Sequence, residues 1–101
     1  MNQCLSFERP MLEKTIVAKI KRALEAEGCK VIKIHGSGLM EAGTPDLIGC
    51  YRGRGFALEV KKDEKGKATI LQARRLAEWM AAGARVGVVY TVETAKEVVL
   101  G

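Results

Sequence analysis

The chain has 101 residues, of which 48% are hydrophobic and 5% aromatic, and its formal net charge is +5. This length provides for one domain over residues 1–101 and excludes a catalytic domain joined to separate recognition modules. No apolar run could span a bilayer and the first residues do not resemble a secretory signal, so we expect a cytoplasmic protein whose basic charge favours a polyanionic partner.

Amphipathic periodicity predicts a first helix of about five turns. Pro10 suits the first helical position, apolar residues recur from Leu12 onward, and Gly28 offers a stop. A short strand over 31–35 follows, ending at His35, and a glycine-rich loop occupies 36–45.

Residues 46–51 and 56–61 form two apolar, strand-like runs joined by Arg-Gly-Arg-Gly, which predicts a hairpin. Strand alternation places Glu59 and Lys61 on one face of the second run. Counting inward from a four-residue turn places Asp46 opposite Lys61, with Glu59 as a diagonal neighbour.

A capping-box pattern, Thr69 followed three residues later by Gln72, opens a second helix that ends at Gly83. The predicted inward stripe of this helix comprises Ile70, Ala73, Leu76, Ala77 and Met80. Trp79 lies off that stripe, where it makes either a subunit contact or a half-buried contact at the helix edge.

A buried strand over 85–90 and a short helix over 91–100 complete the pattern. The last helix should direct four small apolar residues inward, namely Val92, Ala95, Val98 and Val99. The whole order predicts an α/β domain with a mixed sheet of about four strands flanked by helices.

The cysteines, Cys4, Cys29 and Cys50, are odd in number and widely spaced. This spacing matches neither a disulfide framework nor a C-x-x-C zinc pair. We therefore expect reduced thiols, with Cys29 and Cys50 as small core residues.

Three ionic groups are predicted to converge at the hairpin. Glu59 and Lys61 project from one strand face with their Cα atoms roughly 6.5 to 7 Å apart, and Asp46 enters the preceding strand behind the rigid Pro45. An exposed ion pair and a turn-capping aspartate are the structural alternatives. Two converging carboxylates suit Mg²⁺ or Mn²⁺, and a lysine beside them can orient an attacking water or offset phosphate charge.

The pair Pro45-Asp46 with Glu59-Val60-Lys61 resembles the signature of the PD-(D/E)xK nuclease superfamily. More specifically, residues 43–49 (GTPDLIG) and 58–62 (LEVKK), together with Gln72, resemble the VRR-Nuc family of virus-type replication and repair nucleases over roughly residues 11–99. The resemblance implies a restriction-endonuclease-like fold. It also implies a metal-dependent DNA endonuclease that acts in the cytoplasm. If the enzyme is phage-encoded, this is the cytoplasm of the host.

By this resemblance, Asp46, Glu59 and the carbonyl of Val60 hold Mg²⁺ or Mn²⁺, and Lys61 lies beside the attacking water. Gln72 reaches the active site from the helix start, and a purely capping role is the alternative. Glu13 matches an acidic residue of the family's first helix, close to the metal directly or through water. Its helical position borders the apolar face, but an ordinary first-turn glutamate would lie there too.

The implied partner is DNA, with four-way junctions or other branched forms favoured, and the resemblance also implies a homodimer or higher homo-oligomer. Flap cleavage and a non-catalytic nucleic-acid-binding module are the alternatives. The predicted DNA-binding residues are Lys33, Ser37, Arg52, Arg54, Lys62, Lys65 and Lys67. His35 receives no catalytic role.

Overall fold

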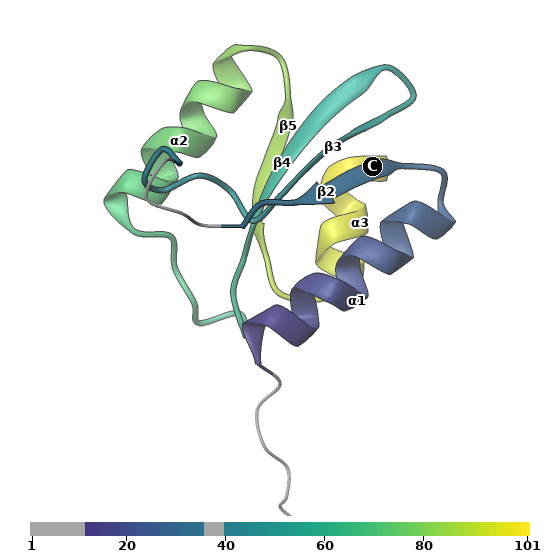
Figure 1. Cartoon of the computed structure of the whole chain (residues 1–101), viewed down its shortest axis with the longest axis horizontal. Helices are drawn as coiled ribbons and strands as arrows, with labels where there is room; N and C mark the ends of the chain where they lie inside the picture. The colour runs from purple at the N-terminus through teal and green to yellow at the C-terminus, as the bar shows by residue number, and fades with distance from the viewer. Residues whose placement is uncertain (1–11, 36–39) are drawn as a thin grey trace, which may run out of the picture.

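A computed structural model describes residues 12–35 and 40–101 (Figure 1). The elements are α1 (Glu13–Ala26), β2 (Lys30–Lys33), β3 (Leu47–Tyr51), β4 (Arg54–Val60), α2 (Ile70–Ala81), β5 (Arg85–Val89) and α3 (Val92–Leu100). This order confirms the one predicted from the sequence. The expected helix start at Pro10 and the residue Cys4 lie outside the described residues.

The strands form one four-stranded sheet in the order β2-β3-β4-β5. Strands β2, β3 and β4 pair antiparallel, and β4 pairs parallel with β5. Helices α1 and α3 cover one face and α2 covers the other (Figure 1). The predicted mixed sheet of the restriction-endonuclease-like fold is therefore confirmed.

The main core lies between the sheet and the pair α1 and α3. Ile20 and Leu24 of α1 are completely buried, as are Leu47 and Leu58 on the strands. From α3, Ala95 and Val99 are buried, while Val92 and Val98 pack against the same cluster. The predicted apolar periodicity of α1 and α3 is therefore confirmed, because each helix buries one face against the sheet.

The β3–β4 turn contains two residues, where the sequence predicted four. Arg52 and Gly53 both have positive φ angles, 51° and 83°, as a type I′ turn requires. Tyr51 consequently pairs with Arg54, and the same register places Asp46 opposite Glu59. The predicted pairing of Asp46 with Lys61 is wrong by two residues, a slip that leaves every side chain on its predicted face.

The predicted inward stripe of α2 is also wrong. Of its five members only Leu76 is buried, whereas Ile70, Ala73, Ala77 and Met80 are exposed. Polar contacts decide this orientation, because Arg75 Nε donates to the carbonyl of Ala42 at 3.0 Å and the Gln72 amide is turned toward Lys61. Part of the polar side of the helix therefore faces the loop before β3 and the end of β4.

Three smaller expectations are settled by burial. Trp79 is half-buried beside the β3–β4 turn, in a groove that it lines together with Arg54 and Gly83. Cys29 is a core residue as predicted, but Cys50 is exposed, because the half of the sheet on which it lies is not covered by α2. Among the described residues, no helix is both long and apolar enough to cross a membrane.

Gly49 occupies a point of close approach within the sheet. A Cβ atom there would collide with the carbonyl oxygen of Lys30 and would lie 2.6 Å from Cζ of Phe56. We expect Gly49→Ala to lower the free energy of unfolding by about 3 kcal/mol, because backbone cannot yield to the added methyl group. Urea denaturation measures this. Gly55→Ala is the control, since the nearest atom to its new Cβ is 3.7 Å away, and equal losses in the two variants would contradict the packing seen at Gly49.

Candidate active site

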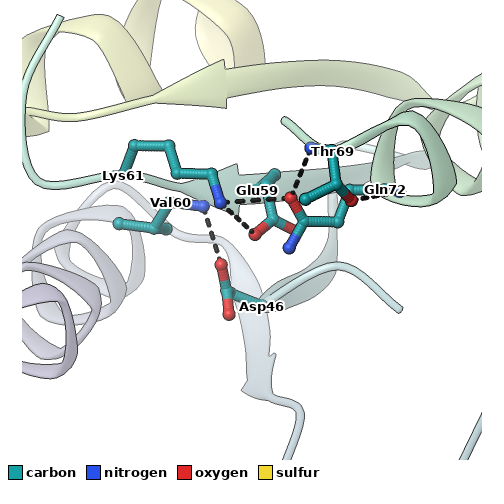
Figure 2. Close-up of polar contacts among 6 residues, drawn as sticks. All are labelled: Asp46, Glu59, Val60, Lys61, Thr69 and Gln72. Carbon is teal, nitrogen blue, oxygen red and sulfur yellow. Dashed lines mark hydrogen bonds and ion pairs between the residues drawn. The ribbon is translucent and has the colours of Figure 1, made fainter. Parts of the chain in front are cut away.

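Asp46 is held rigidly at the start of β3. Its carbonyl accepts from the N–H of Ile34 at 2.9 Å, and its own N–H donates to the carbonyl of Leu58 at 3.0 Å. Its side-chain Oδ2 accepts the N–H of Val60 at 2.7 Å (Figure 2). Pro45, which precedes it, is fully buried. The carboxylate therefore has a defined place beside the end of β4.

Glu59 is the one buried charged residue of the described chain, with 3% of its surface exposed. Its Oε2 lies 3.5 Å from Nζ of Lys61. Its Oε1 has no hydrogen-bond partner among the described residues. A buried carboxylate oxygen without a partner is costly, and in native proteins it calls for an explanation such as an ion.

The electrostatics of the site point the same way. Burial raises the pKa of Glu59 to about 7 from an ordinary 4.5, and the neighbouring Asp46 carboxyl adds to the increase through its negative charge and by accepting a hydrogen bond from the protonated form. The ammonium of Lys61 acts in the opposite direction without cancelling it. Two carboxylates thus share one buried region with less positive charge than they need.

Lys61 is oriented by the start of α2. Its Nζ donates to Oε1 of Gln72 at 3.1 Å, and the same oxygen accepts the backbone N–H of Thr69 at 2.9 Å (Figure 2). The hydroxyl of Thr69 in turn accepts the N–H of Gln72 at 3.1 Å. The predicted capping box is present, and the glutamine that completes it also binds the lysine.

Gly66 contributes to the site in a way that the sequence reasoning missed. It closes a turn after β4 through its N–H, which donates to the carbonyl of Asp63 at 3.0 Å. A Cβ atom at this position would lie 2.6 Å from Cβ of Lys61. The glycine in the polar stretch KDEKGKA was the available signal, and it leaves room for the lysine side chain.

The donor set fits a hard divalent cation. Two carboxylates with one unpartnered buried oxygen are the ligands that Mg²⁺ and Mn²⁺ prefer, and such ions retain several waters. Across residues 12–35 and 40–101, no three His, Cys, Asp or Glu side chains are grouped to hold a metal. Glu13, exposed at the start of α1, therefore does not complete a three-residue set with Asp46 and Glu59. Its role through a water stays a prediction.

The basic residues separate into two groups that the sequence had combined. Lys62, Lys65 and Lys67 are exposed on the loop that directly follows Lys61. The other group, Arg52 and Arg54, lies at the β3–β4 turn at the far end of β4. From residue 54 to residue 61 the strand rises about 23 Å.

Three further residues from the sequence analysis lie in or after β2. Lys33 is half-buried at the end of β2, where it pairs with Leu47. His35 is exposed in the segment after β2. Ser37 lies outside the described residues.

Comparison with known proteins identifies the family. The sequence model that describes the archaeal Holliday junction resolvase (Hjc) family matches residues 14–96 of this chain. The chain belongs to this family. A solved structure described as a VRR_NUC domain is 32% identical, aligns over 84% of this chain and 90% of its own length, and has a TM-score of 0.70. The predicted resemblance to the VRR-Nuc family is therefore confirmed, and the chain is a member of the Hjc family. No curated protein matches the chain.

The raised pKa of Glu59 leads to a prediction about stability. Below pH 4.5 the group is protonated in both states, whereas between pH 4.5 and about 7 the unfolded chain loses a proton that the folded chain retains. Stability is therefore lost as the pH rises through this window, by about 3 kcal/mol in total. In EDTA, Glu59→Gln should match the wild-type protein at low pH and exceed its stability at pH 8, as measured by urea denaturation.

Added Mg²⁺ should raise the stability of the wild-type protein at pH 8 and leave Glu59→Gln nearly unchanged, since binding to the native state stabilises it. Glu64→Gln is the matched control, because Glu64 is an exposed loop residue and its substitution should change neither the pH dependence nor the response to Mg²⁺. A difference between the wild-type protein and Glu59→Gln that does not vary with pH would refute this account.

Proposed function

We propose that this chain is a metal-dependent endodeoxyribonuclease that hydrolyses phosphodiester bonds in branched DNA, with four-way junctions as the preferred substrate. The observation that carries the proposal is the buried Oε1 of Glu59, which lacks a partner in the described structure while Asp46 and Lys61 lie beside it. Membership of a family named for Holliday junction resolution supports the choice of substrate.

Asp46 and Glu59 would hold Mg²⁺ or Mn²⁺ together with the carbonyl of Val60. When bound, the cation supplies Lewis-acid chemistry, which activates a water for attack and offsets the charge of the phosphate. The protein's own contribution is to keep the two carboxylates close, at a cost that a bound cation relieves above the pKa of Glu59. That cost also makes the site selective for cations.

Lys61 has a separate part in this reaction. Its ammonium is held between Glu59 at 3.5 Å and Gln72 at 3.1 Å, so it is positioned before the substrate arrives. There it can orient the attacking water and stabilise the negative charge that develops on the phosphate. Glu13 is proposed to assist through a water from the start of α1.

The two basic groups would contact the DNA backbone at different distances from the cleaved bond. Lys62, Lys65 and Lys67 adjoin the site, and Arg52 and Arg54 lie about 23 Å away, a span of about seven base-pair steps. Lys33 and Ser37 are proposed as further contacts. Such contacts position the nucleic acid without reading its sequence. A homodimer would bring two sites to one junction, whose arms come in symmetric pairs.

Cleavage of synthetic junction, flap, duplex and single-stranded DNA tests the proposal. We expect the wild-type protein to cut the junction fastest, with Mg²⁺ or Mn²⁺ required. Asp46→Asn and Lys61→Ala should lower the single-turnover rate by at least about a hundredfold, because each removes a group that acts at the reacting atoms. Lys21→Ala is the control, since its ammonium pairs with Glu25 one turn further along α1, and this substitution should not affect the rate.

Products that form in EDTA, or that form equally fast with Asp46→Asn and Lys61→Ala, would rule out the metal mechanism. Faster cutting of flaps than of junctions would assign the substrate to the flap alternative. Intact binding without cleavage of any substrate would favour a binding module instead.

A further inference from the structure

A groove of about 310 Å³ opens where the end of α2 meets the β3–β4 turn. Apart from Trp79 and Arg54, it is lined by glycine and alanine residues alone. A methyl group added at Gly53 or Gly83 would meet no atom within 4 Å, so the space beside these glycines is empty. The groove therefore combines one large aromatic residue and one cation with a lining that otherwise has no bulky side chain.

The indole of Trp79 has an unused hydrogen-bond donor. Trp79 is half-buried, and its ring N–H donates to no described residue. This N–H is not enclosed, because the one buried side-chain polar atom without a partner in residues 12–35 and 40–101 is Oε1 of Glu59. A buried tryptophan usually directs its N–H to a partner. An open N–H beside an empty space is therefore suited to a ligand that has both a flat face and a hydrogen-bond acceptor.

Arginine residues give the surroundings of the groove a positive charge. Nε of the exposed Arg54 donates to the carbonyl of Gly83 at 3.3 Å, and its two terminal nitrogens have no partner among the described residues. The guanidinium carbon of Arg52 lies 5.3 Å from the centre of the Tyr51 ring. A second groove, of about 370 Å³, shares Arg54 with the first and adds Arg52 and Arg85. Within the described chain, neither groove has Asp or Glu in its lining, so the charge is complementary to phosphate.

We infer that the groove beside Trp79 binds one unpaired nucleotide, whose base stacks on the indole while Arg52 and Arg54 bind the phosphates that flank it. Aromatic side chains stack on the face of any base, and arginine matches the geometry of a phosphate group. Ligand sites commonly enclose about 300 to 1,000 Å³, so a groove of about 310 Å³ suits a single base and is too small for a paired duplex.

This site rests on the proposed function only in so far as the nucleotide belongs to DNA. Arg54 lies about 23 Å along β4 from Lys61, so the nucleotide bound in the groove is not the one at the cleaved bond. A base leaves the stack at the lowest cost where pairing is already interrupted, as in single-stranded or mismatched DNA. The groove would thus select branched DNA that carries an unpaired segment over a continuous duplex.

Fluorescence tests this site directly, because Trp79 is the one tryptophan of the chain. In EDTA, we expect a duplex with a short single-stranded gap to quench the emission of Trp79. A fully paired duplex of the same length should bind without quenching it. Inorganic polyphosphate should not quench it either, since it has no base. Free deoxyadenosine monophosphate should quench it only at much higher concentration, since it lacks the second flanking phosphate.

Variants test the two parts of the site separately, with anisotropy of labelled DNA as the measurement. Trp79→Ala should weaken binding of the gapped DNA about ten- to a hundredfold, as loss of one stacked base does, and should leave the paired duplex nearly unchanged. Trp79→Phe keeps an aromatic face and should restore much of the difference. Arg54→Met should weaken both DNAs and reduce the salt dependence, because phosphate contacts do not distinguish them. Met80→Ala is the matched control, since Met80 is the next residue of α2, is 59% exposed and does not line the groove.

Equal quenching by gapped and paired DNA, or equal weakening of both by Trp79→Ala, would overturn the base site. Emission that changes with protein concentration in the absence of DNA would also overturn it, because a second copy would then cover the indole. A mononucleotide that binds as tightly as gapped DNA would assign the groove to small ligands instead. Wild-type quenching requires no substitution, so it decides the matter even if Trp79→Ala does not fold. Selective quenching in a protein that cuts no DNA would count against the nuclease proposal alone, and junction cleavage without quenching would count against the groove alone.

Discussion

The burial of the Glu59 carboxylate is the constraint on which the site depends. Its Oε1 has no partner among the described residues, and its pKa is raised to about 7 by burial and by Asp46. A protein tolerates so costly a group where function requires it. The surrounding contacts fix its two charged neighbours: Asp46 accepts the N–H of Val60, and Lys61 donates to Gln72. A bound divalent cation would offset the free-energy cost of burying the Glu59 carboxylate.

Backbone geometry brings these side chains together from distant parts of the chain. The two-residue turn at Arg52 and Gly53 places Asp46 opposite Glu59, and a turn longer by two residues would separate them along the strands. The parallel pairing of β4 with β5 requires a crossover, which is provided by α2. Because that helix begins at the end of β4 where the site lies, its first turn delivers Gln72 to Lys61 (Figure 2).

Helix α2 makes polar contacts on one side and leaves apolar residues exposed on the other. Its polar side faces the loop before β3 and the active site, where Arg75 and Gln72 make their contacts. On its other side, Ile70 and Met80 are 84% and 59% exposed.

The sequence by itself determined the order of the elements and indicated the residues of the candidate site. Helical and strand periods are local properties, so Glu59 and Lys61 could be placed on one strand face, and Thr69 with Gln72 at a helix start, without knowledge of the fold. The motif around Asp46 indicated the family for the same reason.

Only the tertiary structure decided how the elements meet. The register depended on the turn conformation of Arg52, a residue type that seldom adopts positive φ. The direction in which α2 faces depended on partners such as Ala42 and Lys61, which are remote in sequence. Periodicity shows that a helix has an apolar side, but it does not show whether the core covers that side.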